Sequence, residues 1–205
     1  MNRFKITLLA LSTIIAAALP LAAQPPAGAP AAARSPAGRG GGRASPHEAI
    51  NGRIDGFLVA LVYGRPYSAR GGQGEKRKIW GELVPFGKVW RTGSDEATLL
   101  VLEKPMTVGG ATVPSGAYTL WTLPAADGSA KLIINKQVGQ WGIDRAQNAL
   151  RDEKLDLAIV DLTKETLETP VDQFTMAVVR NPAGGGVIRM SWENLAYSVP
   201  VAAVK

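Results

Sequence analysis

Basic and aromatic side chains alternate along residues 64–93, the part of the sequence best suited to hold an anionic molecule. An arginine presents a planar fork of donors to a carboxylate or phosphate, and a tryptophan presents a flat apolar face. Together these groups suit a glycan or another small anionic ligand. The predicted ligand-binding residues are Arg65, Lys78, Trp80, Lys88, Trp90, Arg91 and Glu96.

The same residues also have a purely structural interpretation. Trp80 and Trp90 would then close the open end of a core beneath a long loop, with the neighbouring charges in water. Arg91 and Glu96 would form an ion pair that fixes the turn before the next strand. The sequence leaves the binding and structural interpretations open.

A catalytic alternative uses Glu96 or His47 as the acid or base. Arg91 would stabilise developing negative charge, as in a hydrolase or lyase. Ser94 lacks the Gly-x-Ser-x-Gly turn of many serine hydrolases. A third alternative is a module that binds a protein partner through a sheet edge or through the end that carries the tryptophans. Whether the protein is an enzyme stays open at this point.

Composition excludes several kinds of site. The chain has no cysteine and one histidine, which excludes disulfides, iron–sulfur clusters, thiolate zinc sites and multi-histidine metal sites. Neither the Walker phosphate-binding motif nor the Gly-x-Gly-x-x-Gly motif occurs. We therefore predict no metal and no cofactor.

The net charge of +6 comes from the beginning of the chain. Residues 46–205 are close to neutral, which argues against a nucleic-acid partner. The first 45 residues contain no acid and five bases: Arg3, Lys5, Arg34, Arg39 and Arg43.

The N-terminal sequence has the layout of a secretory signal. A basic start, an apolar run over residues 6–19 and small residues near position 23 predict a signal peptide over residues 1–23. Residues 24–45 are rich in Ala, Pro and Gly and predict a disordered linker, and residues 46–205 form the folded domain. We expect a periplasmic or secreted protein, without a transmembrane span after cleavage and with an envelope glycan as one candidate ligand.

The folded part shows the pattern of an all-β protein. Short β-branched and aromatic runs alternate with turn residues, and only Trp141–Glu153 is a candidate helix. Asp55-Gly56 and Gly109-Gly110 are typical of two-residue hairpins. The pattern predicts a single antiparallel β-sandwich, or a distorted barrel, of about ten strands. The predicted runs are 49–54, 57–63, 97–102, 106–108, 111–113, 118–123, 131–135, 155–162, 174–179, 187–193 and 195–201.

Several motifs together resemble a bacterial family of domains of unknown function, family 2911. The resemblance covers about residues 45–201, and its most specific block is residues 79–98. It implies an exported β domain without an established activity. The motifs are Ser45-Pro46-His47-Glu48, Tyr63-Gly64-Arg65-Pro66, residues 77–93, Glu96-Ala97-Thr98, residues 114–118, Asn135-Lys136, Gln140-Trp141-Gly142 and Ser191-Trp192-Glu193-Asn194.

Overall fold

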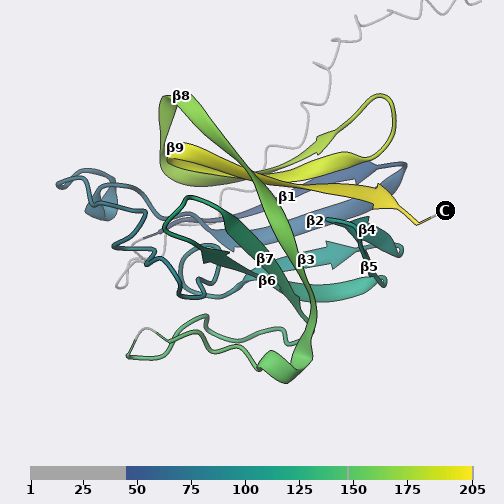
Figure 1. Ribbon diagram of the computed structural model, residues 1–205, viewed down its shortest axis with the longest axis horizontal. Coiled ribbons are helices and arrows are strands. Elements are labelled where there is room, and N and C mark those ends of the chain that lie inside the picture. The colour runs from purple at the N-terminus through teal and green to yellow at the C-terminus, as the bar shows by residue number, and fades with distance from the viewer. Residues whose placement is uncertain (1–44, 147, 205) are drawn as a thin grey trace, which may run out of the picture. The chain divides into compact units, whose positions relative to one another are not determined.

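Nine antiparallel strands form one continuous sheet, in the order β1-β2-β3-β6-β7-β8-β9-β4-β5. The computed structural model describes residues 45–146 and 148–204 (Figure 1). The predicted signal peptide and most of the predicted linker lie outside these residues. The strands are β1 His47–Ile54, β2 Phe57–Gly64, β3 Thr98–Leu102, β4 Met106–Val108, β5 Ala111–Val113, β6 Gly116–Pro124, β7 Ala130–Asn135, β8 Asp156–Arg180 and β9 Gly186–Ala203.

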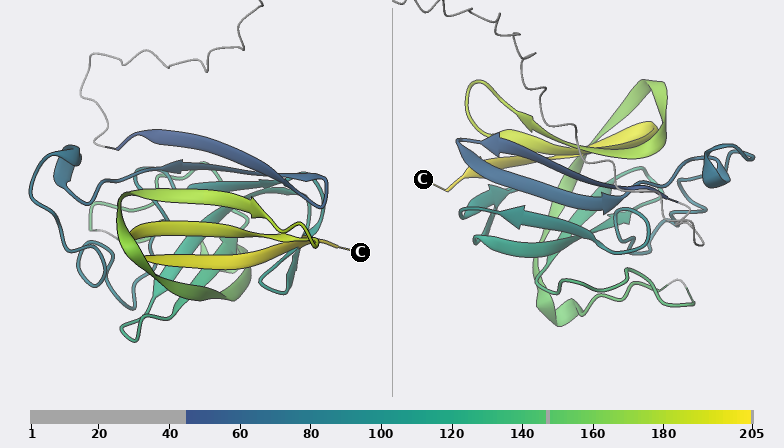
Figure 2. Two further views of the ribbon diagram at one scale, coloured as in Figure 1. Left: turned by 90° about the horizontal axis from the view of Figure 1, so that it is seen from above. Right: turned by 180° about the vertical axis from the view of Figure 1, so that it is seen from behind.

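The long strand β8 joins two layers. Its first part pairs with β7 as far as Leu162, and the part from Thr163 onward pairs with β9. Figure 1 shows β8 rising from the layer of β6 and β7 to the layer of β9, and Figure 2 shows the two layers from other sides. The predicted antiparallel β-sandwich is confirmed, and the sheet is not closed into a barrel.

Both predicted two-residue hairpins are present. Asp55 and Gly56 connect β1 to β2 with φ angles of 52° and 88°. Gly109 and Gly110 connect β4 to β5 with φ angles of 58° and 86°. Two positive φ angles in succession give the turn whose twist matches that of the flanking strands.

The described residues form nine strands, fewer than the predicted runs, because two pairs of neighbouring runs each belong to one continuous strand. Residues 155–162 and 174–179 mostly belong to β8, and residues 187–193 and 195–201 belong to β9. The ladder between β8 and β9 shifts register between Thr166 and Val171 and again before Thr175. In the sequence, a proline such as Pro170 indicates the end of a strand. In the structure, strand β8 continues through Pro170, and the pairing with β9 is interrupted there by a bulge.

The one candidate helix of the sequence, Trp141–Glu153, does not form an α-helix among the described residues. This stretch is a loop with one isolated bridge between Ile143 and Ala149, followed by the short 3₁₀ turn η2 Glu153–Leu155. Ala149 from this loop packs against Trp121 and Ile133, which face away from the main core. The loop therefore covers the second face of β6 and β7. An irregular loop can do this without the regularly spaced apolar residues of an amphipathic helix. No helix among the described residues is long and apolar enough to span a membrane.

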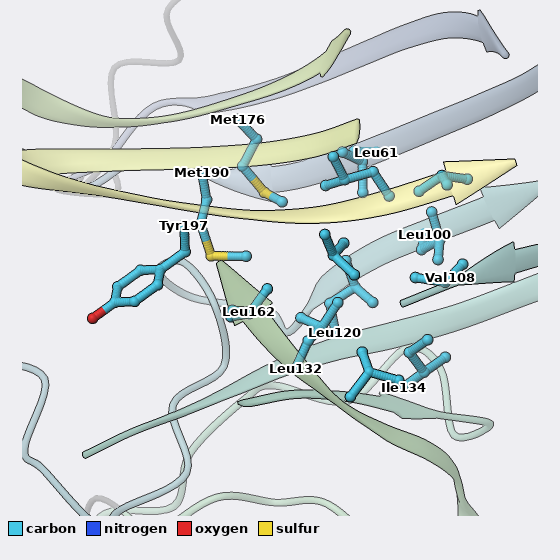
Figure 3. Packing of buried hydrophobic residues seen from close by; sticks show 14 of the residues in the cluster. Leu61, Leu100, Val108, Leu120, Leu132, Ile134, Leu162, Met176, Met190 and Tyr197 are labelled. Carbon is cyan, nitrogen blue, oxygen red and sulfur yellow. The ribbon is translucent and has the colours of Figure 1, made fainter. Parts of the chain in front are cut away.

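The main core lies between the two layers. Alternate residues of the strands point into it, among them Leu61 of β2, Leu100 of β3 and Leu120 of β6 (Figure 3). Met176 and Met190 contribute from the opposite layer. This packed core supports the long connection between β2 and β3, where most of the candidate site residues lie.

Candidate functional site

The connection between β2 and β3, residues 65–97, lies at one end of the sandwich, at the left in Figure 1. Its beginning is fixed to β8: the Ser68 amide donates to the Asp172 carbonyl at 2.7 Å, and the Phe174 amide donates to the Pro66 carbonyl at 2.9 Å. Its end is fixed to β6 because Trp90 and Thr122 exchange two backbone hydrogen bonds of 2.8 Å. The connection is therefore anchored at both ends.

An aromatic cluster underlies this connection. The rings of Trp90 and Trp192 stack with centroids 5.9 Å apart, and Phe174 meets Trp90 edge-on at 5.1 Å. Trp80 contacts Trp90 at 6.2 Å and Tyr197 at 5.5 Å. The Trp80 indole N–H donates to the Trp192 carbonyl at 3.3 Å. Both predicted tryptophans thus close the core, as the structural interpretation expected.

A cavity of about 450 Å³ opens beside this cluster. Trp90 and Trp192 line it, together with Tyr67 from the start of the connection. Trp90 therefore has two roles, since it packs on the core and also faces the cavity. The charged side chains of the lining are Arg70, Arg77, Glu82, Lys88, Arg91 and Asp95, four bases against two acids.

Arg91 is one of two partly buried cations of the cavity, the other being Arg77. Its Nε donates to the Gly93 carbonyl at 3.3 Å, while its Nη1 is buried and finds no acceptor among the described residues. Burial lowers the pKa of the Arg91 guanidinium, and the nearby carboxylates of Asp95 and Glu96 act in the opposite direction. The hydrogen-bonding capacity of Arg91 Nη1 is thus unsatisfied among the described residues.

Arg77 fastens the start of the connection. Its Nε donates to the Ser68 carbonyl at 3.2 Å and its Nη2 donates to the Tyr67 carbonyl. Burial lowers the pKa of Arg77, and the positive charge of Arg70 adds to this effect. Two guanidinium groups of like charge therefore share one wall of the cavity.

The corner over residues 92–95 has an unusual backbone. Thr92 has a φ of 54° and Asp95 a φ of 66°, a region in which a β-branched residue is strained. The buried Thr98 hydroxyl donates to the Thr92 carbonyl at 2.5 Å and so holds the corner in place. Ser94 Oγ and Asp95 Oδ2 are buried without a hydrogen-bond partner among the described residues. Both residues line the cavity.

His47 and Glu96 lie at a different hollow. His47 Nε2 lies 2.9 Å from Glu96 Oε2 and 3.7 Å from Asp95 Oδ2. Both residues line a mainly apolar hollow of about 390 Å³ between β2, β3 and the loop near Gln140. The predicted catalytic trio is thus divided, with Arg91 at one cavity and His47 and Glu96 at another.

Besides Glu96, three more predicted ligand-binding residues lie outside the cavity lining. Arg65 donates to the Phe174 carbonyl at 3.2 Å and contacts Glu48 at 3.3 Å. Lys78 forms an exposed ion pair with Glu82 at 3.2 Å. Trp80 belongs to the aromatic cluster. Of the predicted set, the cavity brings together Lys88, Trp90 and Arg91.

A family model described as "Protein of unknown function (DUF2911)" matches residues 45–201. The chain belongs to the DUF2911 family. No curated protein and no solved structure matches the chain. For this DUF2911 domain, the chemistry of the site therefore rests on its own residues.

Several cavity residues of the DUF2911 chain were not singled out from the sequence. Tyr67, Arg70 and Arg77 belong to the basic and aromatic segment, so composition alone pointed to their region. Ser94 and Asp95 adjoin Glu96, yet the absence of a hydrogen bond to Ser94 Oγ and Asp95 Oδ2 among the described residues depends on the turn. Trp192 comes from β9, and no local pattern connects it to residues 65–97.

The other surface features of the DUF2911 domain offer less chemistry. A third hollow, of about 380 Å³, lies at the turn between β8 and β9 and has Arg180 as its one charged lining residue. No group of three or more histidine or acidic side chains that could hold a metal occurs within residues 45–146 and 148–204. The 450 Å³ cavity is the candidate functional site.

Proposed function

We propose that this protein is a non-catalytic binding protein of the bacterial cell envelope, and that its 450 Å³ cavity takes a small anionic ligand. The observation that carries the proposal is the cavity lining, with an excess of two positive charges beside an aromatic wall. The volume lies in the range of about 300–1,000 Å³ typical of small-molecule sites, which combine apolar walls with a few placed polar groups.

Arg91 gives this proposal its sharpest support. Burying a guanidinium N–H without an acceptor costs free energy, so such groups normally find a partner. Nη1 of Arg91 has none among the described residues, and a ligand carboxylate or phosphate would supply one. Arg70 and Lys88 are exposed and would add a longer-range attraction that salt weakens.

The envelope location rests on the sequence of the first 23 residues. Two bases precede an apolar run and a small-residue segment, as in secretory signals. Export places the domain where glycans and small anions are available as ligands.

The catalytic alternative has less support. A reaction that uses Glu96 or His47 together with Arg91 needs these groups around one substrate, and they line separate hollows.

The test is a thermal-shift screen of the purified protein against carboxylates, phosphates and neutral sugars. A ligand at 100 times its Kd stabilises the folded state by about 2.7 kcal/mol, which at this size raises Tm by several degrees. We expect shifts from anionic compounds that weaken as salt rises. Absence of any shift across the anions would overturn the proposal.

Matched variants separate the cavity from general charge effects. Lys88→Met removes a cavity lysine, and Lys104→Met removes an exposed lysine that follows the far end of β3. We expect weaker anion binding in the first variant and unchanged binding in the second. Equal losses in both would show that the anions respond to net charge rather than to the cavity.

A further inference from the structure

The corner over Arg91–Asp95 presents three buried polar atoms without a hydrogen bond among the described residues: Arg91 Nη1, Ser94 Oγ and Asp95 Oδ2, of which Asp95 Oδ2 also lies 3.7 Å from His47 Nε2. All three residues line the same cavity. Ser94 has 8% of its surface exposed, so water reaches it poorly. Buried polar groups are nearly always hydrogen-bonded, and a cluster of exceptions in one pentapeptide points to an external partner.

The three groups differ in what they need. A guanidinium only donates hydrogen bonds, a carboxylate only accepts them, and a hydroxyl does both. A simple anion such as phosphate would satisfy Arg91 and Ser94 but would meet repulsion from the Asp95 carboxylate. The best complement is therefore a molecule that carries an anionic acceptor and also hydroxyl donors.

The aromatic wall adds a third requirement. Trp90 is partly buried and stacks on Trp192, so its ring is held in a fixed orientation beside the polar corner. A flat apolar ring face favours a ligand that has an apolar side of its own. A sugar ring combines such a side with outward-pointing hydroxyl groups.

The corner is rigid before any ligand arrives. The strained Thr92 is held through its carbonyl by Thr98, at 2.5 Å, and through its hydroxyl by Thr122, at 2.8 Å. Backbone strain of this kind persists only where the surroundings enforce it, and it gathers at functional sites. Preorganisation lowers the ordering cost of binding.

We infer that the cavity recognises a sugar acid, either free or as the end of an acidic glycan; this inference rests on the proposed binding function. The ligand carboxylate binds Arg91, its hydroxyls donate to Asp95 and exchange hydrogen bonds with Ser94, and the ring lies against Trp90.

The inference is tested by calorimetry with three monomeric probes of similar size: glucuronate, glucose and cyclohexanecarboxylate. We expect glucuronate to bind at least tenfold more tightly than either of the others, since each of them lacks one of the two required features. Equal binding of cyclohexanecarboxylate and glucuronate would overturn the inference and leave anion binding intact. Binding of none of the three, with no other anion active in the thermal-shift screen, would overturn the proposed function itself.

Two variants identify the residues responsible. Asp95→Asn keeps the shape and suits the positive φ, because asparagine adopts this region more readily than most residues. It should weaken glucuronate about tenfold and leave cyclohexanecarboxylate unchanged or tighter. Ser94→Ala removes a hydroxyl without a partner in the described protein, so it should weaken glucuronate while Tm stays close to that of the wild type. Unchanged glucuronate affinity in both folded variants would overturn the inference.

The same measurement separates the two sources of the ligand. An oligomer of galacturonate presents a sugar acid at the end of a chain, and galacturonate itself is the matching free monomer. Tighter binding of the oligomer indicates a glycan end, and tighter binding of the monomer indicates a free sugar acid; either result supports the inference when cyclohexanecarboxylate is weaker than both.

Discussion

The hydroxyl oxygens of Thr92 and Thr122 lie 2.8 Å apart in the core, directly beneath the corner that carries Arg91 and Asp95. Thr122 belongs to β6, and its backbone also pairs with Trp90. A strand of the rigid sheet therefore determines the position of a loop that lines the cavity. The strained φ of Thr92 is stable only because this contact and the bond from Thr98 restrain it.

Thr122→Val removes this restraint while keeping the shape of the side chain. We expect the free energy of unfolding to fall by about 1–2 kcal/mol, because the buried Thr92 hydroxyl loses its side-chain partner. Affinity for the anionic probe should fall as well, since the corner becomes less ordered. Thr112→Val, at the exposed position of β5, is the control and should leave both quantities nearly unchanged. Urea denaturation and calorimetry measure the two effects, and a Thr122→Val variant as stable as wild type contradicts the argument.

Local chemistry explains which parts of the fold were predictable. The hairpin at Asp55-Gly56 is specified by two adjacent residues, and the pattern of β2 by alternate burial within one strand. The continuity of β8 is not local. It depends on pairing with β7 at one end and with β9 at the other, and its irregular middle resembles a strand end in the sequence.

In the candidate site, too, the residues that were predicted are those specified by local sequence, and the others depend on distant parts of the chain. Lys88, Trp90 and Arg91 were predicted because residue type and segment composition suffice to find them. Asp95 and Trp192 were not predicted. Asp95 reaches the cavity through a backbone with a positive φ, and Trp192 reaches it because β9 packs against Trp90. Arg65 and Lys78 have suitable chemistry but form ion pairs with Glu48 and Glu82. Glu48 comes from β1, so its approach to Arg65 depends on the pairing of β1 with β2.

Trp80 and Trp90 differ in a way that substitution can reveal. Both pack in the aromatic cluster, so Trp80→Phe and Trp90→Phe should each lower the free energy of unfolding by about 1–3 kcal/mol. Only Trp90 lines the cavity, so only Trp90→Phe should weaken binding of the glucuronate probe. Thermal denaturation followed by calorimetry of the folded variants tests this. Equal loss of affinity in the two would show that the effect comes from core packing.

Gly142, in the loop after β7, leaves room for the Arg91 side chain because it has no Cβ. A Cβ added to Gly142 would lie 2.2 Å from Arg91 Cδ and 2.8 Å from Arg91 Cβ, which is too close for any real contact. We expect Gly142→Ala to displace the Arg91 side chain, to weaken anion binding and to destabilise the fold by about 1–3 kcal/mol.

A double-mutant cycle isolates this contact. Arg91→Ala removes the atom at 2.2 Å, so adding Gly142→Ala to it should cost less than in the wild-type background. Denaturation of the four proteins gives the coupling free energy. Strict additivity would mean that the added methyl group acts on something other than Arg91.

Tyr63 gives the fold a dependence on alkaline pH. Its buried hydroxyl donates to Glu48 Oε2 at 2.6 Å and accepts from the Met176 amide at 2.9 Å. Burial, the hydrogen bond to Glu48 and the charge of that carboxylate raise the pKa of Tyr63 to about 12. The unfolded chain releases this proton near pH 10. The stabilisation is therefore fully present below pH 10 and is lost as pH rises from about 10 to 12.

Tyr63→Phe should accordingly show a smaller fall in the free energy of unfolding between pH 10 and pH 12 than the wild-type protein. Burial also raises the pKa values of Tyr118 and Tyr197, so some decline should persist in the variant. At pH 7 the variant should be less stable by about 1–3 kcal/mol, because the buried Met176 amide loses its acceptor. Urea denaturation across this pH range measures both effects. If the free energy of unfolding falls equally in the two proteins above pH 10, ionisation of Tyr63 does not cause the loss of stability at alkaline pH.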